Sequence, residues 1–295
     1  MQSPYIVKPS SQMIWHISRR FYGPVDRLVY YDSGIAADRD LKMLYFLLKH
    51  KAATISQIAR VCYPGKRKIR EHLRRLAGGG VIDCFSWGDA NLKVKPLVYC
   101  PNRVSQAMLE EYYPEMPAIG YNNWRRRSVQ DAAAILLANE FVIRAGTCIY
   151  DYSAEPCFNI GRYRIVPTAS FTAGGTALIL LVLRGNEQTV RFTKDLPIYE
   201  QLVEASVGLK GYRNPSVLLL VCETIPQALD TAAFISANST LSRYRITTDS
   251  EILFKPPHQA FFAFEKGRLV VRAANIFKAS FDNVPEGSTN YLGYV

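Results

Sequence analysis

Apolar residues recur at helical spacing near the N-terminal end of the chain. In residues 38–50 they fall every three or four positions, which predicts an amphipathic helix. Thr54 and Gln57 have the spacing of a capping box and predict a second helix that ends near Val61. The sequence Tyr63-Pro64-Gly65 then predicts a turn. We therefore expect two helices here, followed by a sharp change of direction.

A third helix and a hairpin are predicted next. The helix begins at Lys66 and ends at the glycines of residues 78–80, because glycine readily adopts the left-handed conformation of a helix C-cap. Its apolar seam consists of Ile69, Leu73 and Leu76. Residues 81–87 and 97–100 have strand character and enclose a basic tip. Three helices followed by a hairpin predict a winged helix-turn-helix.

The third predicted helix carries a basic surface. At about 100° per residue, Arg67, Arg70 and Arg74 lie on the side away from the apolar seam. Arginine in a major groove pairs bidentately with guanine, and lysines at a hairpin tip can contact phosphate. The residues predicted to bind DNA are Lys66, Arg67, Lys68, Arg70, Arg74, Arg75, Lys93 and Lys95. The alternative is a solvated basic face that binds a partner protein.

The net charge of the chain supports the DNA interpretation. The formal charge is +11, and residues 1–127 hold 21 Lys and Arg against 10 Asp and Glu. Residues 128–295 hold 15 of each kind and are neutral. This asymmetry predicts a nucleic-acid-binding domain over 1–127 and a second domain over 128–295. Prolines, asparagines and three arginines before Ser128 are typical of a linker at that boundary.

The second half alternates predicted helices and strands. Ser128 is expected to cap an alanine-rich helix over 129–139, and the apolar residues 141–144 read as a strand. Further strands are predicted at 148–152, 163–166, 169–171, 177–183, 216–222 and 244–247, and helices at 194–207 and 225–237. Gly174-Gly175 predicts a tight hairpin turn, and a last hairpin is expected about Gly267. The fold class is therefore mixed α/β, with a central mixed sheet covered on both faces.

Candidate metal and catalytic residues are sparse. The six cysteines include no CxxC pair, and the four histidines show no zinc-binding spacing. Neither a phosphate-binding loop nor a nucleophile elbow is present. The longest apolar runs, 132–138 and 177–183, are too short to cross a membrane. We expect a cytoplasmic protein with reduced cysteines, no metal, no cofactor and no membrane partner.

Both halves carry residues that match one family. The N-terminal match consists of Asp40, Leu41, Leu44, Leu47, Thr54, Ile58, Leu73, Leu76, Gly80, Val81 and Ile82. The C-terminal match consists of Arg164-Ile165-Val166-Pro167, Leu181-Val182-Leu183-Arg184-Gly185, Lys194 and Tyr199. Over about residues 36 to 255 the chain resembles the replication-relaxation family of mobile-element proteins. The resemblance implies a winged helix-turn-helix joined to a restriction-endonuclease-like domain.

The C-terminal half departs from active nucleases of that fold. Such nucleases hold magnesium with carboxylates, since magnesium is a hard cation that prefers oxygen ligands. The resemblance places Thr168, Leu181 and Leu183 at those positions, and Glu187 and Asp195 stand at loop and helix-start positions nearby. We therefore expect an inactive scaffold that serves dimerisation or the docking of a partner, and no enzymatic activity.

The expected function is sequence-specific binding of double-stranded DNA by a homodimer. The resemblance implies a role in replication, relaxation or transfer of a plasmid or integrative element, with a relaxase or replication protein as a candidate partner. Two alternatives stay open. One is a transcriptional regulator with a dimerising or ligand-binding C-terminal domain, and the other is a nuclease or nickase with an unrecognised active site.

Overall fold

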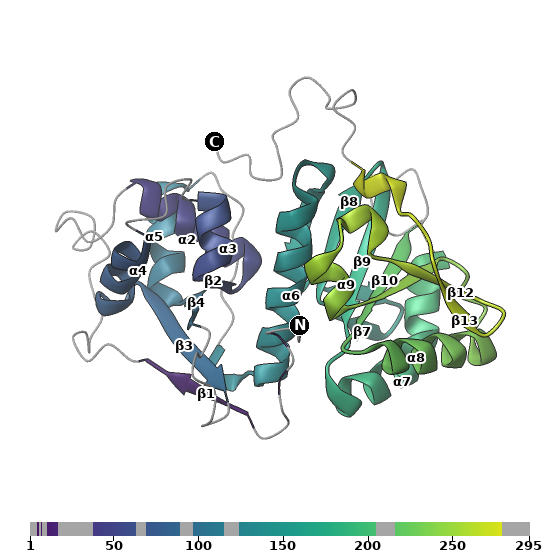
Figure 1. Cartoon of the computed structure of the whole chain (residues 1–295). Helices are drawn as coiled ribbons and strands as arrows, with labels where there is room; N and C mark the ends of the chain where they lie inside the picture. Colours follow the sequence, from purple (N-terminus) through teal and green to yellow (C-terminus); the bar gives the residue numbers. More distant parts are fainter. Residues whose placement is uncertain are drawn as a thin grey trace. The chain divides into compact units, whose positions relative to one another are not determined.

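The chain forms two compact units in the computed structural model (Figure 1). The structure describes residues 5, 7, 11–16, 38–62, 69–88, 97–114, 124–204 and 216–278. The N-terminal unit comprises Val7–Ala132, and the C-terminal unit comprises Met1–Ile6 with Ala133–Val295. The division falls inside a helix, slightly later than the boundary expected before Ser128.

The N-terminal unit combines helices with a four-stranded sheet. Its elements are β1 (Gln12–Trp15), α2 (Asp38–His50), β2 (Ala53–Thr54), α3 (Ile55–Cys62), α4 (Ile69–Gly78), β3 (Ile82–Gly88), β4 (Leu97–Pro101), α5 (Arg103–Tyr112) and the 3-10 turn η1 (Trp124–Arg126). The strand order is β1-β3-β4-β2, and every neighbouring pair is antiparallel. The hairpin β3–β4 is thus joined at one edge by β2, the short strand between the first two helices.

Local signals account for the helix boundaries of this unit. The Thr54 amide donates to Gln57 Oε1 at 3.0 Å and the Gln57 amide donates to Thr54 Oγ1 at 3.3 Å, so the predicted capping box is confirmed. Helix α4 ends at Gly78, and Gly80 follows with a left-handed φ of 73°. The predicted turn at residues 63–65 lies outside the described residues.

All three tryptophans of the chain lie around one phenylalanine in the N-terminal unit. The ring centroid of Phe85 is 5.0 Å from that of Trp15, 6.1 Å from Trp87 and 5.9 Å from Trp124. Aromatic pairs at such distances add stabilisation beyond the area they bury. Tryptophan fluorescence therefore monitors the N-terminal unit alone.

The C-terminal unit is built on a seven-stranded mixed sheet. Its elements are α6 (Val129–Ala145, shared with the N-terminal unit), β5 (Tyr150–Ala154), β6 (Phe158–Ile160), β7 (Tyr163–Ile165), β8 (Ala169–Ala173), β9 (Thr176–Val182), α7 (Gly185–Glu204), β10 (Val217–Cys222), α8 (Ile225–Asn238), β11 (Tyr244–Thr248), α9 (Asp249–Phe254), β12 (Phe262–Glu265) and β13 (Arg268–Val271). The strand order is β13-β12-β11-β10-β9-β8-β5, with β9, β10 and β11 parallel to one another. Strands β6 and β7 form a separate two-stranded sheet.

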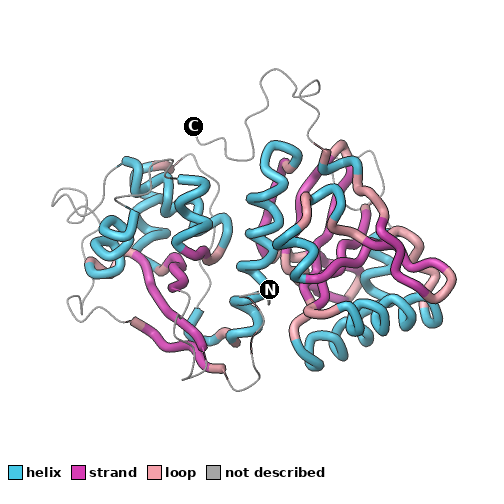
Figure 2. The backbone as a smooth tube through the Cα atoms, viewed as in Figure 1, coloured by secondary structure: helices cyan, strands magenta, loops and turns pink. Residues whose placement is uncertain are grey.

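Helices cover both faces of the large sheet, as the sequence predicts (Figures 1 and 2). Helices α7 and α8 pack on one face, in a core cluster that includes Phe192, Leu218 and Ile235. Helix α6 brings Phe141 to a second cluster, where its ring meets Phe261 and Phe277 edge-on at 5.6 and 5.2 Å. The mixed α/β architecture is therefore confirmed at the level of layers and sheet.

Two predictions for this unit are wrong in detail. Residues 141–144 do not form a strand but continue α6 to Ala145, because Phe141 and Val142 extend the buried helix face. Helix α7 begins at Gly185 and not at residue 194. Its first turns are polar and exposed, so they lack the apolar period by which a helix is recognised in sequence.

Two turns match their sequence signals. Gly174 and Gly175 join β8 to β9 with φ values of 54° and 73°, and Gly267 joins β12 to β13 with a φ of 77°. Two successive left-handed residues are the requirement of a two-residue hairpin turn.

Among the described helices, none is both long enough and apolar enough to cross a membrane.

Replacing Phe141 by alanine should destabilise the C-terminal unit by about 3–5 kcal/mol, because the cavity removes edge-on contacts in a closed aromatic cluster. Urea denaturation followed by circular dichroism measures this change. Val190→Ala is the matched control, since Val190 is 51% exposed and its truncation should change stability by less than about 0.5 kcal/mol. Equal effects of the two substitutions would contradict the assignment.

Candidate nucleic-acid interface

Helix α4 presents two arginines to solvent. Its seam of Ile69, Leu73 and Leu76 is buried, with exposed fractions of 2%, 0% and 0%. Arg70 and Arg74 are exposed on the other side, as the helical spacing predicts. The arrangement leaves two guanidinium groups available to a partner of opposite charge.

Arg75 has a different environment from its neighbours on α4. Its Nη2 donates to Asp40 Oδ2 at 2.5 Å and lies 3.1 Å from His72 Nδ1. Asp40, on α2, is fully buried, so its charge requires a cation beside it. Arg75 therefore ties α4 to α2, and its contact with DNA stays a prediction.

The other predicted DNA-binding residues fall outside the described part of the chain. These residues are Lys66, Arg67, Lys68, Lys93 and Lys95. The first three precede the described start of α4, and the last two lie between β3 and β4. The structure thus describes the exposure of Arg70, Arg74 and Arg75 among the predicted residues, and the first two are exposed.

His72 is the titratable group inside this packing contact. Burial lowers its pKa below the ordinary value of 6.5, and the nearby Arg39 and Arg75 act in the same direction, while Asp40 and Glu71 oppose them. The ring is therefore neutral at pH 7. Since Arg75 only donates, Nδ1 accepts, which assigns the proton of the neutral ring to Nε2.

In the C-terminal unit, the three residues that the sequence resemblance aligns with the magnesium ligands of nucleases offer no carboxylate. Thr168 precedes β8 and lies beside the end of β9, where its Oγ1 accepts a hydrogen bond from the Val182 amide at 3.0 Å. Leu183 belongs to the core cluster beneath α7 and α8, and Leu181 packs against it. Apolar side chains in that core cannot hold a hard cation.

A buried charged cluster lies at the carboxyl ends of the parallel strands. Arg184, after β9, is 1% exposed, and its Nη1 is 2.8 Å from Asp249 Oδ2 and 3.7 Å from Glu223 Oε1. Glu223 follows β10 and Asp249 follows β11. Glu223 Oε2 also accepts from the Gly185 amide at 3.2 Å. One cluster thus joins three strand ends.

Sequence reasoning did not single out this cluster, although a signal exists. Arg184 and Glu223 each stand within two residues of an apolar strand's end, and Asp249 directly follows β11. Carboxyl ends of parallel strands share one edge of a sheet, so charged residues there are brought together. The described residues contain no group of three or more His, Cys, Asp or Glu that could hold a metal ion.

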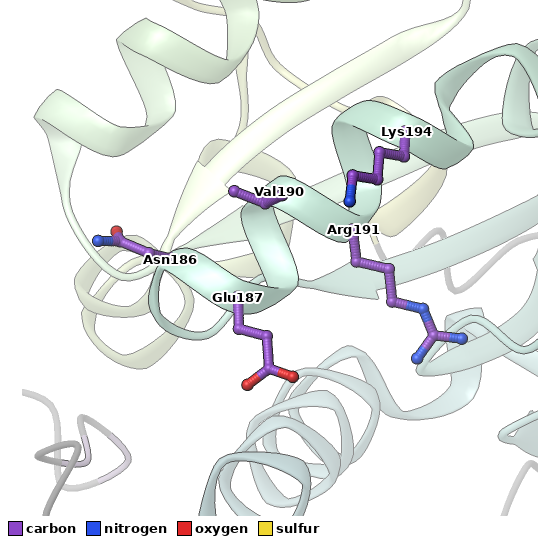
Figure 3. Close-up of a pocket in the computed structure, with 5 residues that line it drawn as sticks. All are labelled: Asn186, Glu187, Val190, Arg191 and Lys194. Carbon is purple, nitrogen blue, oxygen red and sulfur yellow. The ribbon is translucent and has the colours of Figure 1, made fainter.

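A shallow hollow of about 390 Å³ lies over the first half of α7. It is lined by Asn186, Glu187, Val190, Arg191 and Lys194 (Figure 3). Glu187 and Arg191 extend toward the same side of the helix (Figure 3). A surface of one helix with both signs of charge does not form an enclosed small-molecule site.

Replacing Arg75 by alanine should destabilise the N-terminal unit by roughly 3 kcal/mol, because Asp40 would stay buried without its partner. This is the lower end of the range for a broken buried pair, since 36% of the Arg75 side chain is exposed. Denaturation followed by tryptophan fluorescence measures it. Arg74→Ala, on the same helix, should change stability by less than about 0.5 kcal/mol. If Arg75→Ala left the free energy of unfolding unchanged, the ion pair would contribute nothing to stability.

In comparisons with known proteins, no family model matches this chain, and no curated protein or solved structure matches it either.

Proposed function

We propose that this protein binds double-stranded DNA in a sequence-specific manner, with its N-terminal unit as a winged helix-turn-helix. The observation that carries the proposal is the exposure of Arg70 and Arg74 on the face of α4 opposite its buried seam. Arginines on such a face can reach base edges in the major groove. In this role α4 is the recognition helix, and α3 precedes it.

The topology of the unit supports the same proposal. The order of elements is α2, β2, α3, α4 and the hairpin β3–β4, with β2 paired to β4. Three helices and a hairpin whose edge is joined by the strand after the first helix are the plan of a winged helix. The tip between β3 and β4 contains Lys93 and Lys95, which are suited to phosphate contacts.

Electrostatics provides independent support. The whole excess charge of +11 belongs to residues 1–127. Binding by such a surface releases counterions from DNA, which drives association and makes affinity fall with salt. Three of these positive charges, Lys66, Arg67 and Lys68, belong to the first segment of the third predicted helix.

We propose that the C-terminal unit is a catalytically inactive, restriction-endonuclease-like scaffold. Thr168, Leu181 and Leu183 supply no carboxylates, and Glu223 and Asp249 are engaged with Arg184. The unit then serves homodimerisation or the docking of a relaxase or replication protein in the cytoplasm. The resemblance to the replication-relaxation family implies a role in replication, relaxation or transfer of a mobile element.

Arg70→Ala should cost on the order of 1–3 kcal/mol at the preferred site and relax base preference there, because one bidentate base contact is lost. The site is first obtained by selecting bound sequences from a random duplex library with the full chain. Fluorescence anisotropy then compares preferred and random duplexes. Arg268→Ala, an exposed arginine in the C-terminal unit, is the control and should leave base preference unchanged.

If Arg70→Ala weakened preferred and random DNA equally, Arg70 would be a phosphate contact. If the unmodified protein selected no sequence and bound no duplex, the proposed function would be wrong. Recovery of bound DNA from cells distinguishes an origin from a promoter as the target.

Incubation of the protein with supercoiled and linear target DNA should yield no cleavage in magnesium or in manganese. The single solvated carboxylate nearest the aligned positions, Glu187, holds these ions weakly. Agarose gel electrophoresis detects nicked and linear products. Cleavage that vanished in Glu223→Gln or Glu187→Ala would overturn the inactive-scaffold proposal and locate an active site.

A further inference from the structure

A small hairpin of the C-terminal unit stands apart from its main sheet. Strands β6 and β7 are inserted between β5 and β8 and pair only with each other among the described strands. Phe158 and Ile160 pack against the core cluster that contains Phe192 and Leu196 of α7. One face of the hairpin is therefore anchored on α7.

The tip and outer face of this hairpin are basic. Arg162, Tyr163 and Arg164 are exposed, and residues 156–167 contain no Asp or Glu. The Arg162 guanidinium lies 5.2 Å from the centroid of the Tyr163 ring, and its Nη2 donates to the Tyr163 hydroxyl at 3.1 Å. Arg164 Nε donates to Cys157 Sγ at 3.0 Å. No carboxylate of the described residues forms an ion pair with either arginine, so both charges face solvent.

Helix α7 adds two cations beside the hairpin. Its one flank is occupied by α8, where Gln227 donates to Thr189 and Ser239 donates to Glu200. At 100° per residue, Arg191 and Lys194 lie toward the opposite flank, and both are exposed (Figure 3). Since β6 packs on α7 and α8 covers the first flank, we infer from helical geometry that these cations and the hairpin lie on the same side of α7.

The acids on this surface do not neutralise it. Arg191 Nε is 3.6 Å from Asp195 Oδ2, but its side chain is 77% exposed. A pair so solvated contributes little, and a phosphate can replace the carboxylate. Glu187 is the other acid of this flank. Arg162, Arg164, Arg191 and Lys194 thus form a cationic surface in the half of the chain, residues 128–295, whose total charge is zero.

We propose that this surface, the hairpin β6–β7 with the adjoining flank of α7, is a second DNA contact that binds phosphates next to the sequence read by α4. The inference rests on the proposed function of the N-terminal unit. Guanidinium groups bind phosphate oxygens bidentately, and phosphate contacts position a protein without reading sequence. Because the N-terminal unit already holds DNA, flanking phosphates reach a high effective concentration at the C-terminal unit.

The test compares two duplexes with the full chain. One is trimmed to the selected site, and the other extends it by about 20 base pairs, or about 68 Å, on each side. The variant is the double substitution Arg162→Ala with Arg164→Ala. The matched control is Lys266→Ala with Arg268→Ala, which removes the same charge from the exposed hairpin β12–β13.

On the long duplex, the variant should reduce the magnitude of the negative slope of log affinity against log salt by about 2, which is close to 0.9 for each lost phosphate contact. On the trimmed duplex, the slope of the variant should equal that of the unmodified protein. The slope of the control should equal that of the unmodified protein on both duplexes. A slope on the long duplex equal to that of the control would overturn the second contact while leaving the proposed function intact. Failure of the unmodified protein to bind either duplex would overturn both the second contact and the proposed function. If the surface bound an acidic protein and the substitutions left the DNA salt slope unchanged, the surface would be assigned to a protein partner.

Discussion

The buried guanidinium of Arg184 imposes the strictest constraint on the C-terminal unit. A charge that is 1% exposed is tolerated only because Asp249 lies 2.8 Å away and Glu223 is close. Arg184 follows β9, Glu223 follows β10 and Asp249 follows β11. The ends of these parallel strands must therefore lie side by side at one edge of the sheet for the charge of Arg184 to be compensated. The same pairing engages Glu223 and Asp249, the two acids of this edge, with Arg184.

Helix α4 shows the same principle in the N-terminal unit. Asp40 is fully buried on α2 and requires Arg75, whereas Arg70 and Arg74 have no such demand and face solvent. One run of basic residues is therefore divided between a packing contact, made by Arg75, and two solvent-exposed side chains. The division fixes the rotation of α4 about its axis, and with it the face that the proposed interface offers to DNA.

The net charge of each half of the chain differs from the charge that its surface exposes. Residues 128–295 are neutral in sum, yet their buried and paired charges do not contribute to the outer field, and Arg162 and Arg164 do. The division into one basic and one neutral half therefore locates the larger excess of positive charge and misses a local cationic surface. A two-point contact of this kind would orient the C-terminal unit on DNA before any partner arrives.

The sequence by itself determined what depends on neighbours within a few residues. The capping box of Thr54 and Gln57, the turn at Gly174-Gly175 and the seam of α4 are local, and the mixed α/β layers follow from alternating apolar strands and helices. Residues 141–144 were misassigned because β-branched and aromatic residues suit a strand equally well until packing against Phe261 and Phe277 favours the helix. Which arginine turns inward was decided only by tertiary structure, since Asp40 is 35 residues from Arg75 and Asp249 is 65 residues from Arg184.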